Sequence, residues 1–179
     1  MGSHYEVTDG VVTKYYYAGA TRIAMRKNGT LYYLLGDHLG STSIVTFENG
    51  NLLSQTKYKA WGEVRHQSGP SLTEYTYTGQ YSHTADFGLM YYNARWYDPY
   101  LNHMTQPDSI VPDLYNSQDY DRYSYARNNP IRYNDPSGHF TCSSDKNSDD
   151  YCPGKPSGSI TSPYKPPKPK PMETSEQGE

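Results

Sequence analysis

An internal repeat constrains the fold of this chain more than any other feature of its sequence. The segment GATRIAMRKNGTL at 19–31 aligns with GSTSIVTFENGNL at 40–52, and the two match at Gly, Thr, Ile, Asn, Gly and Leu. The copies begin at residues 19 and 40, which gives a period of 21 residues. Gly62 and Gly69 continue this spacing and indicate a third, degraded copy. A period near 20 predicts stacked supersecondary units, each of which buries its apolar face against the next.

The residues within and around the repeat favour strands and turns. Short segments rich in Tyr, Thr, Ile and Val alternate with glycines: KYYYAG, TRIAM, TLYYLL, STSIVTF, LLSQTKYKAW, EYTYTG and FGLMYYNARWY. Asn28-Gly29 and Asn49-Gly50 separate strand-like residues, and such pairs favour type I′ hairpin turns because both residues accept a positive φ. The sequence therefore predicts an all-β fold of stacked antiparallel hairpins, with an open sheet edge at each end.

The aromatic composition predicts a core that is not purely apolar. The chain has 21 Tyr against 3 Phe and 2 Trp, so tyrosine must supply most of the buried ring area. A buried tyrosine also brings a hydroxyl that needs a hydrogen-bond partner. We therefore expect ring-on-ring packing with each hydroxyl bonded to backbone or to another side chain.

Charge, hydropathy and residue spacing argue against several classes of function. The formal net charge is −3 and no basic stripe is present, which argues against nucleic-acid binding. No apolar run approaches the roughly 18 to 20 residues of a membrane span, and the N-terminus lacks the pattern of a secretory signal. The six His show no metal-ligand spacing, so neither a metal site nor a cofactor is expected.

The C-terminal part changes character twice. The strand pattern weakens from Pro99 to Asn134, where DLYNSQDYDRYSYARNN at 113–129 is the one stretch that favours a short helix or helical turn. After Phe140, seven of the thirteen Pro of the chain fall between 153 and 171. This composition predicts a disordered tail with polyproline II bias in YKPPKPKP.

Two cysteines and one turn motif leave alternatives open. Cys142 and Cys152 either form a local disulfide or remain two idle thiols. The motif NNPIRYNDPSGHF at 128–140 concentrates Asn, Pro, Asp and Gly just before the tail. It is either a tight turn that closes the last hairpin or a cleavage site that separates the tail from the rest.

Three motifs in order carry a resemblance to a known family. They are GDHLGSTSIVTFENGNLLSQTKYKAWGE, YTGQYSHTADFGLMYYNARWYDPYLNHMTQPDSI and RYSYARNNPIRYNDPSGH. From about residue 10 to His139 the chain resembles the RHS repeat-associated core of the tyrosine-aspartate (YD) repeat family. The resemblance implies a spiralling β-sheet that closes, in full-length members, into a shell around a variable C-terminal polypeptide, often a toxin. It also implies self-cleavage just after the DPxG motif by an aspartic protease activity.

This resemblance implies three regions. Residues 1–98 would be the repeat sheet, 99–139 the plug with the cleavage site, and 140–179 the variable tail. Without the upstream repeats of a full-length member, this stretch is not expected to enclose anything alone. We expect it to act outside the cell or at the cell surface, as part of a larger exported system.

The resemblance also implies a pair of catalytic carboxylates. By motif position they are Asp108 in QPDSI and Asp135 in NDPSG, and the scissile bond is His139–Phe140. Two close carboxylates split their pKa values, so that one activates water while the other stays protonated. His103 stands where the family usually has Arg and is a candidate orienting cation. Four arginines are alternatives, although each is expected to pair with a surface Asp or to stack on Tyr: Arg95, Arg122, Arg127 and Arg132.

Each of these acidic residues also has a structural interpretation. Asp135 occupies the first position of a type I turn, with Pro second and Gly fourth. Asp108 follows Pro107 and suits a loop, and Asp98-Pro99 suits the turn of a repeat. Asp37, His38 and Ser41 are the residue types of a hydrolase triad, yet they belong to the DHLGST repeat motif.

Two functions from different classes therefore stand side by side. In the first, Asp108 and Asp135 cut after His139 and release the tail. In the second, the chain is a structural or adhesive β-module that associates with itself or with another repeat chain by strand addition at its open edges. Tyrosine-rich faces also stack sugars, but the sequence alone defines no carbohydrate site.

Overall fold

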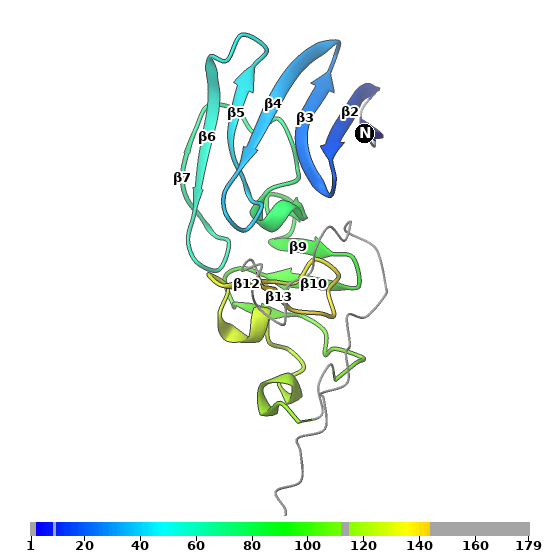
Figure 1. Cartoon of the computed structure of the whole chain (residues 1–179), viewed down its shortest axis with the longest axis vertical. Helices are drawn as coiled ribbons and strands as arrows, with labels where there is room; N and C mark the ends of the chain where they lie inside the picture. Colours follow the sequence, from blue (N-terminus) through cyan, green and yellow to red (C-terminus); the bar gives the residue numbers. More distant parts are fainter. Residues whose placement is uncertain (1–2, 9, 112–114, 144–179) are drawn as a thin grey trace, which may run out of the picture.

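Three antiparallel sheets make up the described part of the chain (Figure 1). The computed structural model describes residues 3–8, 10–111 and 115–143. The largest sheet is a seven-stranded meander in which each strand pairs with the next along the chain. Its strands are β1 (Ser3–Thr8), β2 (Val11–Ala18), β3 (Thr21–Lys27), β4 (Thr30–Gly36), β5 (Thr42–Phe47), β6 (Leu52–Tyr58) and β7 (Val64–Ser68).

Two smaller sheets and three 3₁₀ turns follow the meander. The four-stranded sheet contains β8 (Tyr81–His83), β9 (Leu89–Tyr92), β10 (Arg95–Asp98) and β11 (His103–Met104). The two-stranded sheet pairs β12 (Tyr133–Asn134) with β13 (Cys142–Ser143). The 3₁₀ turns are η1 (Tyr77–Gly79), η2 (Ser117–Tyr120) and η3 (Ala126–Asn128). The predicted all-β fold of stacked hairpins is confirmed, and the helical turn expected within 113–129 occurs as η2 and η3.

The sequence repeat corresponds to a β-hairpin. One copy forms β3 and β4 and the next forms β5 and β6, and their first strands begin at Thr21 and Thr42. β7 starts the degraded third copy, but no described strand pairs with its far side. β1 and β7 are thus the outer strands of the sheet, in agreement with the predicted open edge at each end.

The two Asn-Gly pairs form different turns. Asn28 and Gly29 both have positive φ values, 50° and 80°, and join β3 to β4 in the predicted two-residue turn. The same prediction is wrong for Asn49-Gly50, where Gly50 has a φ of 83° and Asn49 is not among the positive-φ residues. There the amide of Phe47 donates to the carbonyl of Asn51 at 2.9 Å, which closes a three-residue loop.

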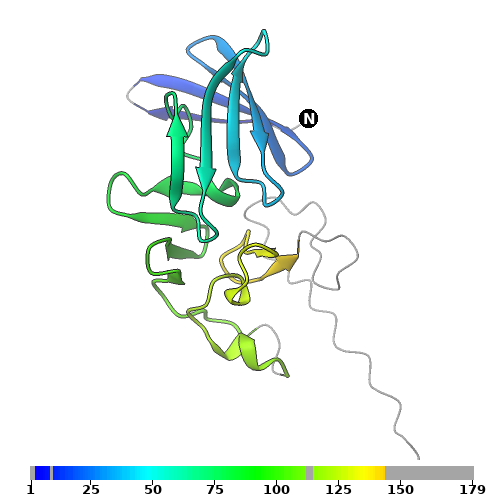
Figure 2. The ribbon, with the colours of Figure 1, turned by 90° about the vertical axis from the view of Figure 1, so that its left-hand side faces the viewer.

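A shared loop design explains this difference. The amide of Asp37 donates to the Ser41 carbonyl, and the amide of Lys59 to the Glu63 carbonyl, with a positive-φ glycine one residue before each acceptor. A three-residue hairpin loop with glycine in the left-handed position adds a bulge and increases the twist. Figure 2 shows the resulting twisted sheet in blue and cyan beside the smaller green and yellow elements.

After β7, residues 69–76 form a crossing segment that runs over one face of the large sheet. The Tyr15 hydroxyl lies 3.0 Å from Thr73 Oγ1, and Lys27 Nζ donates to the Leu72 carbonyl at 3.1 Å. Thr42 binds the same segment twice, through its amide to Thr76 O and through Oγ1 to Tyr75 O. This crossing segment covers the apolar face of the repeats and leads into the second sheet.

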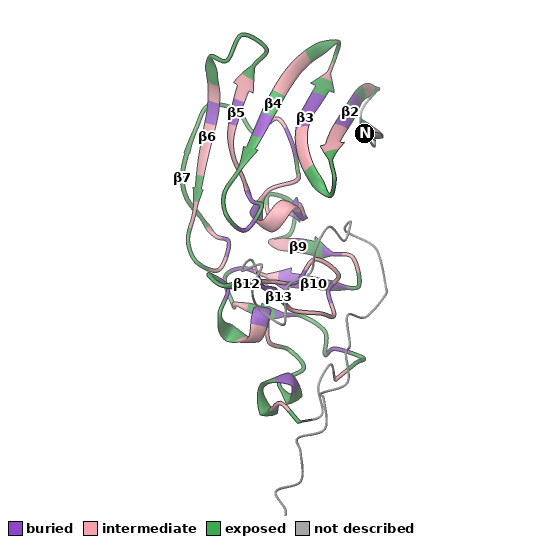
Figure 3. Cartoon of the chain, in the orientation of Figure 1, coloured by how far each residue is buried: buried purple, intermediate pink, exposed green. Residues whose placement is uncertain are grey.

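The buried hydrophobic residues form two clusters. Figure 3 marks buried positions in purple both along the large sheet and in the smaller elements. The cluster under the large sheet contains Tyr15, Met25, Leu34 and Val45, with the partly buried Leu72 and Tyr75 of the crossing segment packed against it. The second cluster contains Leu39, Tyr77, Met90, Tyr92, Tyr97, Met104, Tyr125 and Ala126. Because the second cluster joins residues from the repeat loops, the small sheet and η3, it fixes the C-terminal elements against the end of the meander.

Tyrosine hydroxyls find partners inside these clusters, as their number in the sequence required. The hydroxyl of Tyr77 donates to Ala60 O at 2.7 Å, and that of Tyr97 donates to Trp61 O at 2.8 Å. The Tyr92 hydroxyl lies 2.8 Å from Thr78 Oγ1 and donates to Tyr125 Oη at 3.3 Å. Each ring therefore buries its area without leaving a polar atom unpaired.

Three further predictions from the sequence concern the boundary between repeat sheet and plug, the C-terminal tail and membrane spans. The boundary drawn between 98 and 99 falls inside the β10–β11 hairpin, so residues on both sides of it belong to the four-stranded sheet. Within the predicted disordered tail, 140–179, Cys142 and Ser143 instead form the buried strand β13, and the residues from 144 onward lie outside the described part of the chain. Among the described residues, no helix has the length and apolar character that a membrane crossing would require.

Candidate active site

The NDPSG motif closes the last hairpin, between β12 and β13, as one of the two interpretations predicted. The closing contacts come from a side chain. Asp135 Oδ1 accepts hydrogen bonds from the amides of Gly138 at 2.8 Å and Ser137 at 3.2 Å. The Asp135 carboxylate thus takes the place that the backbone carbonyl has in an ordinary type I turn.

The same carboxylate oxygen reaches the predicted cleavage site. Asp135 Oδ1 also accepts from the amides of His139 and Phe140, each at 3.1 Å. Ser137 Oγ accepts from these two amides at the same distance. The nitrogen of the His139–Phe140 bond is therefore held against a carboxylate and a hydroxyl.

Gly138 allows this loop to lie close to the second sheet. Its φ is +79°, and a Cβ at this position would collide with the Tyr92 carbonyl oxygen and crowd Ala94. The close approach lets Arg95 Nε donate to the Gly138 carbonyl. A left-handed backbone and a lack of space both require glycine here.

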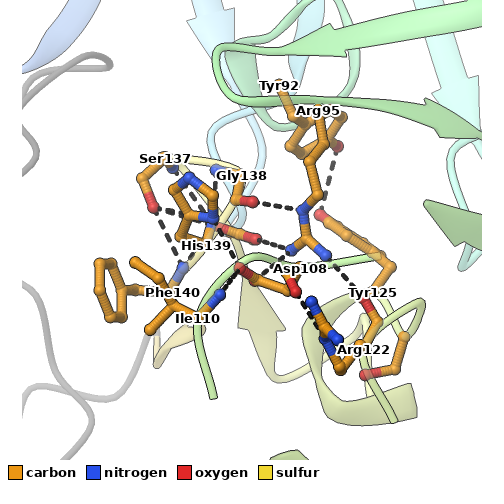
Figure 4. A network of polar contacts seen from close by, with 12 residues as sticks. Tyr92, Arg95, Asp108, Ile110, Arg122, Tyr125, Ser137, Gly138, His139 and Phe140 are labelled. Carbon is orange, nitrogen blue, oxygen red and sulfur yellow. Dashed lines mark hydrogen bonds and ion pairs between the residues drawn. The ribbon is translucent and has the colours of Figure 1, made fainter. Parts of the chain in front are cut away.

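Arg95 brings the two predicted carboxylates together, and Figure 4 shows its guanidinium beside Asp108. Its Nη2 atom lies 3.0 Å from Asp108 Oδ2 and 3.2 Å from Asp135 Oδ2. Asp108 and Asp135 are 27 residues apart in the chain, yet both contact one nitrogen atom. The expected meeting of these residues occurs, with a guanidinium between their carboxylates.

Backbone contacts fix Asp108 in its loop after β11. Its amide donates to the Arg122 carbonyl at 2.7 Å, and Arg122 Nε donates back to the Asp108 carbonyl at 2.6 Å. Asp108 Oδ1 accepts from the Ile110 amide at 2.9 Å and lies 2.7 Å from His139 Nδ1. Asp108 is thus connected to the residue that precedes the predicted scissile bond.

The centre of this cluster is shielded from solvent. Arg95 and Asp108 are each 5% exposed and Asp135 is 3% exposed. Burial raises the pKa of Asp135, and the positive charge of Arg95 and the amide donors oppose that rise. A proton is therefore easier to place on Asp135 than on a carboxyl in water.

The structure corrects the expected source of the positive charge. His103 is exposed on β11, opposite Asp98, whereas Arg95 contacts both carboxylates. Arg95 was expected to pair with a surface Asp, and that expectation is wrong. The alternation of strand residues could have indicated it, because in β10 Arg95 lies on the same face as the buried Tyr97.

The other singled-out residues have structural contacts. Arg127 pairs with the buried Asp119 at 2.8 Å and supports η3, and Arg132 lies over the Tyr133 ring at 5.2 Å. The Asp98 carboxylate accepts amides of its own turn, as its turn interpretation predicted, and the Asp37 carboxylate does the same within the DHLGST motif. Cys142 is in a disulfide, and Cys152, the only other cysteine of the sequence, lies outside the described residues. No group of three His, Cys, Asp or Glu suited to a metal ion occurs in the described part of the chain.

Comparison with known proteins agrees with the repeat architecture. The model of the teneurin YD-shell family matches residues 2–131. The chain belongs to the YD-shell family. Salivary gland surface protein 1 of Aedes aegypti is 32% identical over 130 residues, which cover 71% of this chain and 4% of that protein. The tRNA3(Ser)-specific nuclease WapA of Bacillus spizizenii is 28% identical over 137 residues, which cover 74% of this chain and 6% of the nuclease.

Solved structures share the YD-shell fold at low sequence identity. A crystal structure of TcdB2-TccC3-Cdc42 matches with a TM-score of 0.60 at 19% identity, covering 72% of this chain and 7% of that chain. The Photorhabdus luminescens Tc holotoxin pore matches with a TM-score of 0.59 at 20% identity, covering 72% and 6%. The chain thus spans only a small fraction of the proteins it resembles.

Replacing Arg95 tests whether this residue holds the site together. Arg95→Met leaves two buried carboxylates without their shared cation, and breaking such a buried ion pair costs about 3–5 kcal/mol. We expect a loss of this size in the free energy of unfolding, measured by urea denaturation. Arg26→Met, at an exposed position of β3, should change it by less than about 0.5 kcal/mol. Equal effects of the two substitutions would contradict the central role of Arg95.

Proposed function

We propose that this YD-shell segment cleaves its own chain between His139 and Phe140 and releases residues 140–179. The observation that supports this proposal is the convergence of Asp108, Asp135 and the Phe140 amide on the cluster around Arg95. Three parts of the chain that are distant in sequence supply these groups. A turn alone requires Asp135 and Gly138, but it does not require a second buried carboxylate beside them.

The proposed reaction is hydrolysis of one peptide bond. Asp108 takes a proton from water, whose oxygen attacks the His139 carbonyl carbon. Asp135, in its protonated form, gives a proton to the Phe140 nitrogen as the carbon–nitrogen bond breaks. The products are a carboxylate at His139 and an α-amine at Phe140. Arg95 orients both carboxylates and balances their negative charge, so it is a positioning residue.

The names of two similar proteins are consistent with a variable segment that follows the YD-shell region at its C-terminal end. One is named as a tRNA-specific nuclease, and one matching crystal structure is of TcdB2-TccC3 without its hypervariable C-terminal region. In this chain the change of composition after Phe140 marks the corresponding boundary. We propose that the segment acts outside the cell or at its surface, within a larger shell protein.

Self-cleavage predicts two fragments, each of a defined mass. Incubated wild-type chain should yield two products by intact mass spectrometry, 1–139 and a fragment that begins at Phe140. Asp108→Asn and Asp135→Asn should each remain whole, because each removes one of the two proton-transfer groups.

Asp119→Asn is the matched control for this experiment. Asp119 is also buried and paired with an arginine, but its partner is Arg127 in η3. The control variant should cleave at the wild-type rate if it remains folded by circular dichroism. A wild-type chain that keeps its full mass after prolonged incubation would refute the proposal.

The cleavage rate should fall as the pH rises. Burial raises the pKa of Asp135 above its ordinary value of 3.8, so this carboxyl holds its proton below the raised value and loses it above. Because the proton is needed at the Phe140 nitrogen, we expect the rate constant to decline as the pH rises through that raised pKa, in a series measured from about pH 4 to about pH 8. His139→Gln, which removes the imidazole that contacts Asp108, should keep this falling limb. A rate that climbs steadily over the range would exclude Asp135 as the acid.

A second candidate function is assembly with another YD-repeat chain or with a second copy of this chain. The observation that favours it is the position of β1 and β7 as the outer strands of the large sheet. All five residues of β7 are exposed. Unpaired strand edges bind further strands through backbone hydrogen bonds.

Light scattering at increasing concentration tests this assembly. The apparent molar mass of the wild-type chain should rise, whereas Val7→Lys combined with Val64→Lys should keep it at the monomer value because charged edges resist pairing. Val7 and Val64 are 59% and 49% exposed on the two edge strands. Leu52→Lys, equally exposed but on the inner strand β6, should leave association unchanged. A monomeric wild-type chain at every concentration would rule out self-assembly through these edges.

A further inference from the structure

A pocket of about 450 Å³ lies beside the plug and plays no part in the proposed cleavage. Its lining is mostly aromatic and comes from the crossing segment, β8, β9 and β10: Tyr75, Gln80, Tyr81, His83, Tyr91, Asn93 and Trp96. Pockets of this size accept small ligands or a few residues of a peptide.

The rings of this aromatic pocket form a continuous surface. Tyr75 meets Tyr81 edge-on at 5.1 Å between centroids, and Tyr81 lies 4.9 Å from the His83 ring. His83 in turn lies 5.6 Å from Trp96, which lies 5.0 Å from Tyr91. Such a surface presents flat apolar faces that pack well against proline rings.

Two amide side chains connect the pocket to the NDPSG loop. Asn93 Nδ2 donates to the Pro136 carbonyl at 2.8 Å, and Gln80 Nε2 donates to the same oxygen at 3.2 Å. The pocket therefore adjoins the loop from which the C-terminal tail departs. A ligand in it would lie near the start of the tail.

Carboxylates surround the Tyr81 side of the pocket. Burial raises the pKa of Tyr81, and the negative charges of Glu6, Glu74 and Asp86 raise it further. His83 Nδ1 contacts Asp86 Oδ2 at 3.0 Å, and Lys27 is a nearby counter-charge to Glu74. Arg22 also lies near this rim, with its guanidinium carbon 3.5 Å from the centroid of the Tyr75 ring. The three acids still outnumber the lysine and the arginine beside them, so the rim suits a cationic ligand.

The chain itself contains a segment with matching chemistry. YKPPKPKP at 164–171 has three Lys, four Pro and no acidic residue. Its composition favours the polyproline II conformation, which aromatic-lined grooves recognise at little entropic cost. The 20 residues between Ser143 and Tyr164 can span up to about 70 Å, so the tether does not limit access.

We propose that the aromatic pocket binds residues 164–171 of the same chain. Prolines of this segment would pack on Tyr91 and Trp96, while its lysines would face the carboxylate rim. A neutral sugar could also stack on these rings, but it would not use the three carboxylates. The proposal does not depend on cleavage, and after a cut at His139 docking would hold the tail without a covalent bond and so delay its release.

Fluorescence of Trp96 in the full chain tests this docking. The chain has two Trp, so Trp61→Phe makes Trp96 the sole indole. Changing the three lysines of the segment to Glu and its four prolines to Ser should shift Trp96 emission to longer wavelength, because an undocked tail exposes the indole. Intact mass must show that 140–179 is still attached.

A synthetic peptide of residues 161–172 provides the complementary measurement. It should bind saturably to the chain with the altered tail, and at least about tenfold more weakly to the chain with the natural tail, which competes. Added salt should weaken binding because it screens the lysine–carboxylate attraction.

Matched pocket variants separate binding from folding. In the altered-tail chain, Tyr91→Ala should weaken the peptide at least about tenfold, since Tyr91 forms part of the ring surface. Tyr100→Ala removes a ring that is 67% exposed and lies outside the pocket lining, and it should change affinity less than about twofold. Unchanged Trp96 emission together with no saturable peptide response would overturn the proposal. A response to neutral oligosaccharides but not to the peptide would overturn it as well and assign the pocket to sugars.

Discussion

One buried guanidinium organises the C-terminal half of this molecule. Arg95 leaves the centre of a small sheet and binds two carboxylates and two backbone carbonyls from three separate loops. Among the residues that the structure describes, none of these loops contains an element longer than a short 3₁₀ turn, so regular secondary structure contributes little to their positions. A buried ion pair is costly unless its geometry satisfies every group. The loops around Arg95 consequently have few alternative arrangements.

Tyrosine performs a related task where the repeat loops meet the small sheet. Each buried ring contributes apolar area and also a hydroxyl that binds a backbone carbonyl or a neighbouring hydroxyl in a specific direction. Aliphatic side chains would bury a similar apolar area but would form no directional hydrogen bonds. The connection between the meander and the plug therefore combines packing with specific hydrogen bonds. These bonds join η1 and the repeat loops to the second buried cluster.

The sequence indicated the repeat sheet well and the site only in part. Strand residues and glycines recur with a fixed period, so local propensity and periodicity sufficed for β3 to β6. The meeting of Asp108 and Asp135 followed from family motifs, because the 26 residues between them carry no periodic sequence signal. The role of Arg95 was not predicted, because an arginine in a strand usually extends into solvent. The structure shows that Arg95 lies on the same buried face of β10 as Tyr97. The Asn49-Gly50 turn differed because loop geometry also depends on the bulge in the strands it joins.

The hydrogen bond from the Phe140 amide to Asp135 has a consequence for the products of a cut. Hydrolysis would turn that amide into an ammonium group, only 3.1 Å from a carboxylate that already contacts its nitrogen. An amide donor would be exchanged for a full positive charge facing a negative one. The new terminus would then stay anchored by an ion pair, so that scission and departure would be separate events with separate barriers.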